Sequence, residues 1–123
     1  MTYDVFLVED SPILRTRVEA MLASIPGARL VGHAAEAASA IQGILAARPR
    51  AVVLDIRLAD GNGFDVLRAV RERQPEVDFY VLTNFANDAY RQMAEKLGAR
   101  GFFDKTNEFE RLQSVLAAAA APA

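Results

Sequence analysis

Five polar residues stand at the ends of short apolar runs in this sequence: Glu9, Asp10, Asp55, Thr83 and Lys105. If folding brings them together, three carboxylates crowd into one place. At about 4 Å and an effective dielectric constant of about 20, each pair of carboxylates costs on the order of 4 kcal/mol. A bound cation must offset this repulsion, or a carboxyl group must take up a proton.

The ligand types indicate which cation and which chemistry such a cluster favours. Carboxylate oxygens without histidine or cysteine nearby prefer Mg²⁺, Mn²⁺ or Ca²⁺ to zinc. Mg²⁺ takes one or two protein carboxylates and leaves positions for water and phosphate oxygens. Lys105 adds a charge that can meet a phosphate oxygen, and the Thr83 hydroxyl can donate to another. A carboxylate in this company is equipped to accept a phosphoryl group as a nucleophile.

The elements that must position these residues can be read from the apolar pattern. Short apolar runs predict five strands, near residues 5–8, 29–33, 51–54, 79–82 and 101–103, and each is followed by apolar residues at helical spacing. Continuous apolar strands between helices predict an α/β fold, a doubly wound five-stranded parallel sheet with five helices. The expected strand order is the flavodoxin-like 2-1-3-4-5, which gathers all five polar residues at the carboxyl edge of the sheet.

Composition limits the possible classes of protein. The chain has 123 residues, which suits one domain over 1–123, and we expect residues 117–123 to form a frayed tail. The absence of cysteine excludes disulfides and thiolate metal sites, and a net charge of −2 without a basic run argues against direct contact with nucleic acid. The sequence shows no signal peptide and no membrane-length apolar run, so we expect a cytoplasmic protein.

Three longer strings surround the five polar residues: LVEDSP at 7–12, VLDIRL at 53–58 with glycines at 61 and 63, and GARGFFDK at 98–105. These strings resemble the receiver domain of two-component response regulators, and the resemblance covers essentially the whole chain. A single string is a weak signal. Five matching strand-end residues in the right order are a specific one.

The resemblance implies a metal site and a phosphoacceptor. By position, Asp55 accepts the phosphoryl group and is also a metal ligand. Asp10 binds the metal directly, Glu9 holds it through water, and the backbone carbonyl of Arg57 completes the protein's share of the coordination. The cofactor that the family uses is Mg²⁺, or Mn²⁺ in its place. No enzymatic activity is expected beyond phosphotransfer to the chain itself and loss of the phosphate.

The resemblance also implies how a signal leaves the site. Thr83 and Lys105 bind phosphoryl oxygens, and Thr83 and Phe102 act as the switch that changes the surface of the fourth helix, fifth strand and fifth helix. The phosphodonor is a sensor histidine kinase or a histidine phosphotransfer protein. An unidentified downstream protein recognises the changed surface. The chain is expected to be a monomer, or a dimer that forms on phosphorylation.

Several positions depart from the common family pattern. Glu9 replaces an aspartate, which should preserve metal binding. Asn84 follows Thr83 where a smaller residue is frequent, and Thr106 follows Lys105 where many receivers have proline. Phe102 lacks the hydroxyl group of the tyrosine that often occupies the switch position.

Two alternatives remain open, and a third, an enzyme, lacks its motif in this sequence. An aspartyl phosphatase would place an Asp-x-Asp pair after a strand, and neither Asp55-Ile56-Arg57 nor Glu9-Asp10 has that form. The chain can be a phosphate-independent pseudo-receiver that serves as an interaction module. It can also be the receiver fragment of a longer DNA-binding regulator.

The single histidine, His33, is interpreted as a solvated residue beside the site, and Met93 as part of the core.

Overall fold

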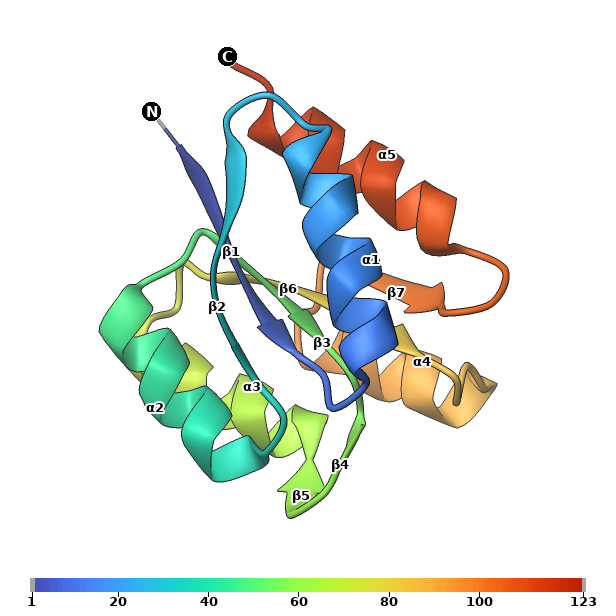
Figure 1. The fold of residues 1–123 in the computed structure, drawn as a ribbon. Coiled ribbons are helices and arrows are strands. Elements are labelled where there is room, and N and C mark those ends of the chain that lie inside the picture. The colour runs from blue at the N-terminus through green and yellow to red at the C-terminus, as the bar shows by residue number, and fades with distance from the viewer. Residues whose placement is uncertain (1, 123) are drawn as a thin grey trace.

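The computed structural model describes residues 2–122, in which strands and helices alternate along the chain (Figure 1). The strands are β1 (Tyr3–Val8), β2 (Ala28–Ala34), β3 (Ala51–Leu54), β4 (Arg57–Leu58), β5 (Gly61–Asn62), β6 (Asp78–Thr83) and β7 (Gly101–Asp104). The helices are α1 (Pro12–Ala23), α2 (Ala37–Ala47), α3 (Gly63–Arg73), α4 (Asp88–Lys96) and α5 (Phe109–Ala120).

The main sheet has the predicted topology. Its five strands are parallel and follow the order β2-β1-β3-β6-β7, which is the order 2-1-3-4-5 once the two short strands are set aside. The fold prediction is therefore confirmed. The antiparallel hairpin β4–β5 was not predicted, because two-residue strands carry no periodic pattern.

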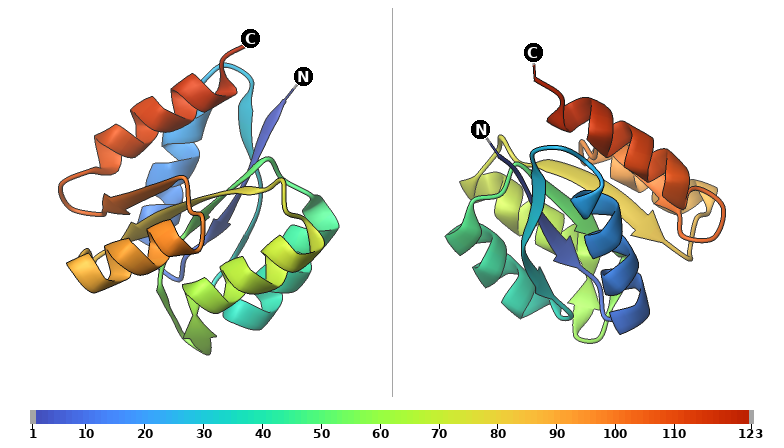
Figure 2. Two further views of the ribbon diagram at one scale, coloured as in Figure 1. Left: turned by 180° about the vertical axis from the view of Figure 1, so that it is seen from behind. Right: turned by 45° about the horizontal axis from the view of Figure 1, so that its top comes forward.

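The helices cover both faces of the sheet (Figures 1 and 2). Helices α1 and α5 lie on one face, and α2, α3 and α4 lie on the other. Side chains such as Leu7, Val53 and Leu112 pack with the first pair, whereas Val52, Leu54 and Ile44 pack with α2 and α3. Because both faces are covered, the central strands β1, β3 and β6 are buried almost throughout, which explains their continuous apolar sequences.

Polar and glycine residues define where several helices begin and end. Ser11 caps α1 by accepting a hydrogen bond from the Leu14 N–H group at 3.2 Å, and Pro12 follows in the first turn. Asn62 and Asn87 cap α3 and α4 in the same way. Gly98, with φ of +83°, ends the α4 segment in the left-handed conformation that glycine tolerates best.

Of two predictions about the helices, one is wrong and the other is not tested by the structure. Met93 was predicted to be buried, and that prediction is wrong: its side chain is exposed and Ala94 faces the core instead, because the short helix α4 turns a narrower face inward. The residues from 117 to 120 belong to α5, which suits the high helix propensity of alanine. Fraying in solution stays a prediction, and Ala123 lies outside the described residues.

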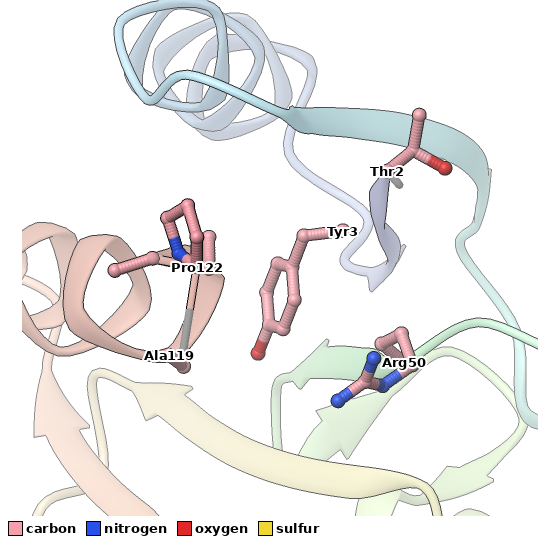
Figure 3. Close-up of a pocket in the computed structure, with 7 residues that line it drawn as sticks. Thr2, Tyr3, Arg50, Ala119 and Pro122 are labelled. Atoms are coloured by element: carbon pink, nitrogen blue, oxygen red, sulfur yellow. The ribbon is translucent and has the colours of Figure 1, made fainter.

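The two ends of the described chain meet at the end of the sheet opposite the carboxyl edge (Figure 1). Thr2 and Pro122 line a single cavity of about 470 Å³, together with Tyr3, Arg50 and the last turn of α5. Figure 3 shows the Tyr3 ring between Ala119 and Arg50. Within residues 2–122, no helix is long and apolar enough to cross a membrane.

Candidate functional site

The candidate site lies at the carboxyl edge of the sheet, where four adjacent strands end. Glu9 follows β1 and Asp55 follows β3, while Thr83 ends β6 and Lys105 follows β7. Backbone hydrogen bonds continue past the strand ends: the Asp55 N–H group donates to the Val8 carbonyl and the Lys105 N–H group to the Thr83 carbonyl, each at 3.0 Å. The sheet therefore holds these residues at neighbouring positions, as the sequence predicted.

Lys105 is the centre of a buried ionic cluster. Its ammonium group donates to both carboxylate oxygens of Glu9, at 2.8 and 2.9 Å, and to Oδ2 of Asp55 at 2.8 Å. Only 12% of the Lys105 side chain, 8% of the Asp55 side chain and 1% of the Glu9 side chain is exposed. Burial by itself disfavours the ammonium charge, but the hydrogen bonds to Asp55 and Glu9 outweigh it and raise the Lys105 pKa.

Glu9 has the most perturbed carboxyl group of the cluster. Burial raises its pKa to about 7, the hydrogen bond from Lys105 opposes that rise, and the nearby charge of Asp55 adds to it. A carboxylate held in this way gains from any additional positive charge beside it. A cation bound beside Glu9 would lower this pKa.

The three acidic side chains can share one ion. Glu9, Asp10 and Asp55 each offer an oxygen, and these oxygens lie within 4.8 Å of one another. Asp10 is exposed while the other two are buried, so the ion would be reached from the Asp10 side. An all-oxygen set fits a hard divalent cation, and its open positions suit water or phosphate oxygens.

Thr83 and the loops beside it form the rim of the site. Thr83 is fully buried, and its hydroxyl oxygen accepts a hydrogen bond from the Phe85 N–H group at 3.1 Å. The Arg57 guanidinium lies 4.1 Å from the centre of the Phe85 ring, so the loop after β3 contacts the loop after β6. Asn84, which lies between Thr83 and Phe85 in the sequence, is exposed.

Phe102 lies away from the ionic cluster, on the α4 side of the sheet. It is half-buried against the small cluster that contains Ile56 and Ala94, whereas Phe103 points to the opposite face and is buried there. The guanidinium of Arg91 lies 4.7 Å from the centre of the Phe102 ring and also donates to the Phe102 carbonyl at 3.3 Å. Phe102 is therefore linked to α4 both by apolar packing and by Arg91.

Two residues of the loop after Asp55 were missed as site residues. Gly63 donates its N–H group to the Ile56 carbonyl at 2.6 Å, and a Cβ atom at this position would collide with the backbone carbonyl of Asp55. Asp60 accepts hydrogen bonds from the backbone of α2. The glycine was visible only as part of a family string, and the contact of Asp60 is too distant in sequence to be seen in any local pattern.

His33 lies outside the cluster, as expected. It is exposed, and its Nδ1 atom lies 3.4 Å from the Arg15 guanidinium rather than near Asp55.

Known proteins resemble this chain in sequence over most of its length. The model of the response regulator receiver domain matches residues 5–117. The DNA-binding transcriptional activator DevR/DosR of Mycobacterium tuberculosis is 37% identical over 101 residues, which are 82% of this chain and 46% of that protein. The chain spans about half the length of the first curated relatives that it matches.

Solved structures give the same result. The receiver domain of the sensor histidine kinase PA1611 from Pseudomonas aeruginosa, which has a magnesium ion coordinated in its active site cleft, is 29% identical with a TM-score of 0.79, and 94% of this chain and 95% of that chain are covered. A LuxR-family two-component response regulator from Aurantimonas is 26% identical with a TM-score of 0.85, over 97% of this chain and 87% of that chain.

Proposed function

Because the chain belongs to the family of response regulator receiver domains, we propose that Asp55 accepts a phosphoryl group with the help of Mg²⁺ bound at Glu9, Asp10 and Asp55. The observation that carries this proposal is the cluster itself. Two buried carboxylates share one ammonium group, and a third, exposed carboxylate stands within metal-binding distance. The magnesium ion in the related receiver of a sensor histidine kinase supports the choice of metal, and Mn²⁺ is the alternative with the same ligand preferences.

The proposed reaction is an in-line transfer from a phosphohistidine. An Asp55 carboxylate oxygen attacks the phosphorus, the P–N bond breaks, and the imidazole leaves with the electron pair of that bond. Oδ1 of Asp55 already accepts a hydrogen bond from the Ile56 N–H group at 2.7 Å, which leaves Oδ2, the oxygen facing Lys105, as the attacking atom. Lys105 then donates hydrogen bonds to the phosphoryl oxygens, where the negative charge develops. When bound, the cation neutralises charge on the transferring group.

Signal output is proposed to use Thr83 and Phe102. The Thr83 hydroxyl, which now accepts from Phe85, would rotate to donate to a phosphoryl oxygen. Movement of that loop frees space beside Ile56, into which Phe102 can shift from its half-buried position. A changed surface of α4, β7 and α5 would then be presented to a partner.

The partners follow from the chemistry and from the relatives. The donor is proposed to be a sensor histidine kinase or a histidine phosphotransfer protein in the cytoplasm, and the chain is proposed to act as a signalling module without turnover of an external substrate. One relative, DevR/DosR, is a DNA-binding transcriptional activator, and the match covers 46% of its length. A receiver that controls such a DNA-binding region is therefore the second candidate, beside a receiver that signals to a separate protein.

Incubation with acetyl phosphate, followed by intact mass, tests the proposal. The wild-type chain should gain one phosphoryl group with Mg²⁺ and none with a chelator, and Asp55→Asn should gain none while keeping its circular dichroism spectrum. Equal labelling of Asp55→Asn would refute the assignment of the phosphoacceptor. A folded wild-type chain that binds Mg²⁺ but takes up no phosphate, from acetyl phosphate or from a kinase, would favour the pseudo-receiver alternative.

A further inference from the structure

We propose that Asp60 is a positioning residue, which fastens the loop after the phosphoacceptor to the N-terminus of α2 and so holds the Arg57 carbonyl at the metal site. The part that concerns the metal rests on the function proposed above. The part that concerns the loop rests only on contacts between described residues.

The contacts of Asp60 complete a helix that cannot cap itself. Its Oδ1 atom accepts from the Ala37 N–H group at 2.5 Å and its Oδ2 atom from the Ala38 N–H group at 3.2 Å. These are the first two amides of α2, and the residue at the N-cap position, Glu36, makes no side-chain hydrogen bond to the helix. Helix N-terminal amides need an acceptor, so a residue 22 positions away supplies the cap that the local sequence lacks.

The charge of Asp60 strengthens this link. The hydrogen bonds from the α2 backbone, that from Ala37 above all, hold the Asp60 pKa below its ordinary range. The carboxylate is therefore ionised at neutral pH, its hydrogen bonds are charge-assisted, and it lies at the positive end of the helix dipole. A neutral acceptor at the same place would make a weaker attachment.

Apart from Asp60, the loop is held to neighbouring elements by Leu58, which packs against the apolar cluster of α2 and α3, and by the contact of Arg57 with Phe85. It is closed by the hydrogen bond from Gly63 N–H to the Ile56 carbonyl and by the pairing of Arg57 with Asn62 in the two-residue strands β4 and β5. A two-stranded hairpin of this size is at best marginally stable in water without packing against other elements. Asp60 is at its tip, so the tip is where an attachment to α2 restrains the loop most.

Arg57 is three residues before Asp60 in the same hairpin, and its carbonyl is the backbone group that the family pattern assigns to the metal. A metal site works only when its ligands are held within about 0.5 Å of the required geometry. Loosening the hairpin tip should therefore weaken metal binding although Asp60 itself touches no ligand. The effect should be smaller than the roughly 10–100-fold loss seen when a direct hydrogen-bond partner of a metal ligand is removed.

Two substitutions and a matched control test the proposal. Asp60→Ala removes the attachment, and Asp60→Asn keeps one neutral acceptor for the Ala37 N–H group. Glu36→Ala removes an exposed acidic side chain from the same helix end without removing any hydrogen bond. For each variant, titration with MgCl₂ alone gives the dissociation constant, and amide hydrogen exchange of the metal-free chain reports on the Arg57 and Gly63 amides.

Asp60→Ala should raise the Mg²⁺ dissociation constant by about threefold to tenfold and speed exchange at Arg57 and Gly63. Asp60→Asn should lie between it and the wild type, and Glu36→Ala should match the wild type. Faster exchange confined to Ala37 and Ala38, with loop exchange and Mg²⁺ affinity unchanged, would overturn the proposal and leave Asp60 as a helix cap only. If the wild type binds no Mg²⁺, the proposed function fails, and the exchange data alone decide whether Asp60 positions the loop.

Discussion

At the scale of single residues, the shared ammonium group of Lys105 is the feature that organises the site. The family pattern assigns Lys105 to the phosphoryl group. In the structure it instead neutralises Glu9 and Asp55, which would otherwise be two buried like charges. If Asp55 accepts a phosphoryl group as proposed, one side chain would serve both purposes in turn, because the phosphoryl oxygens would be new acceptors at the place where Lys105 already lies.

Glu9 should make the stability of the metal-free chain depend on pH. Its pKa in the folded chain is about 7, above the ordinary value of 4.5, so the folded chain holds this proton more tightly than the unfolded chain. The stabilisation from this group is complete below about pH 4.5 and is lost as the pH rises through about 7. Urea unfolding between these pH values should show that fall, and Glu9→Gln should flatten it. An unchanged pH profile in Glu9→Gln would contradict this assignment.

Gly63→Ala should displace the backbone of Asp55, the proposed phosphoacceptor. The added Cβ atom would meet the Asp55 carbonyl group and the Ile56 Cα atom, which are backbone atoms and cannot rotate away. Overpacking of this kind costs about 1–3 kcal/mol of stability, and the displaced Asp55 should take up phosphate from acetyl phosphate more slowly. Gly61→Ala, where the nearest contact is an ordinary 3.4 Å, is the control and should behave as the wild type in the same two assays.

The residue-level site was predicted in part. The positions of Glu9, Asp55, Thr83 and Lys105 follow from strand ends in a known strand order, so the sequence sufficed for their convergence. It did not reveal that Lys105 bonds Glu9, because that contact joins residues 96 positions apart and depends on side-chain conformation. Their roles in phosphotransfer and metal binding stay predictions.

At the scale of elements, Arg91 ties three elements of one face together. It extends from α4, covers the Phe102 ring of β7, donates to the Phe102 carbonyl, and pairs with Glu108 at the start of α5 at 3.4 Å. Glu108 in turn accepts from the Asp104 N–H group. Helix α4 buries only Ala94 completely, so this polar link carries an unusual share of its attachment.

Arg91→Ala should therefore loosen α4 more than it destabilises the whole chain. We expect a loss of about 0.5–2 kcal/mol in unfolding free energy, summed from an exposed ion pair and a cation–π contact, and faster amide exchange in α4. Arg111→Ala removes the other arginine that pairs with Glu108. Arg111 belongs to α5, so this variant should leave amide exchange in α4 unchanged. Equal amide exchange rates of α4 in Arg91→Ala and Arg111→Ala would contradict the prediction that the contacts of Arg91 hold α4 in place.

The elements themselves were largely predictable, and the exceptions have clear causes. Short continuous apolar runs such as the one around Val52 and Val53, alternating with helical patterns, are typical of buried parallel strands. The hairpin β4–β5 escaped because its pairing depends on a turn rather than on hydrophobic spacing. Met93 was misplaced because α4 turns only a narrow face toward the core, and hydrophobic spacing does not show how wide the buried face is.

At the scale of the whole molecule, an apolar core supports a charged site whose three carboxylates repel one another. The core lies on both faces of the sheet, while the acidic cluster lies beyond the strand ends. A cation that reduces the repulsion among these carboxylates must therefore stabilise the complete fold, since it binds the folded chain and not the unfolded one.

Mg²⁺ should raise the unfolding free energy of the whole chain. At a free concentration of 100 times the dissociation constant the gain is about 2.7 kcal/mol, which thermal unfolding can measure. Asp10→Ala should abolish most of the gain, because it removes the exposed ligand without touching the bonds of Lys105. NaCl at matched ionic strength is the control, and an equal gain with NaCl would exclude specific binding.

The position of the chain ends has a practical consequence. Thr2 and Pro122 line one cavity at the end of the sheet farthest from Asp55. A tag, a fluorophore or a sensor-chip tether joined at either end leaves from that side and keeps the acidic cluster turned toward the solution. Immobilised chains should then all present the same face to a kinase flowing past, so surface-based kinetics would sample a single orientation.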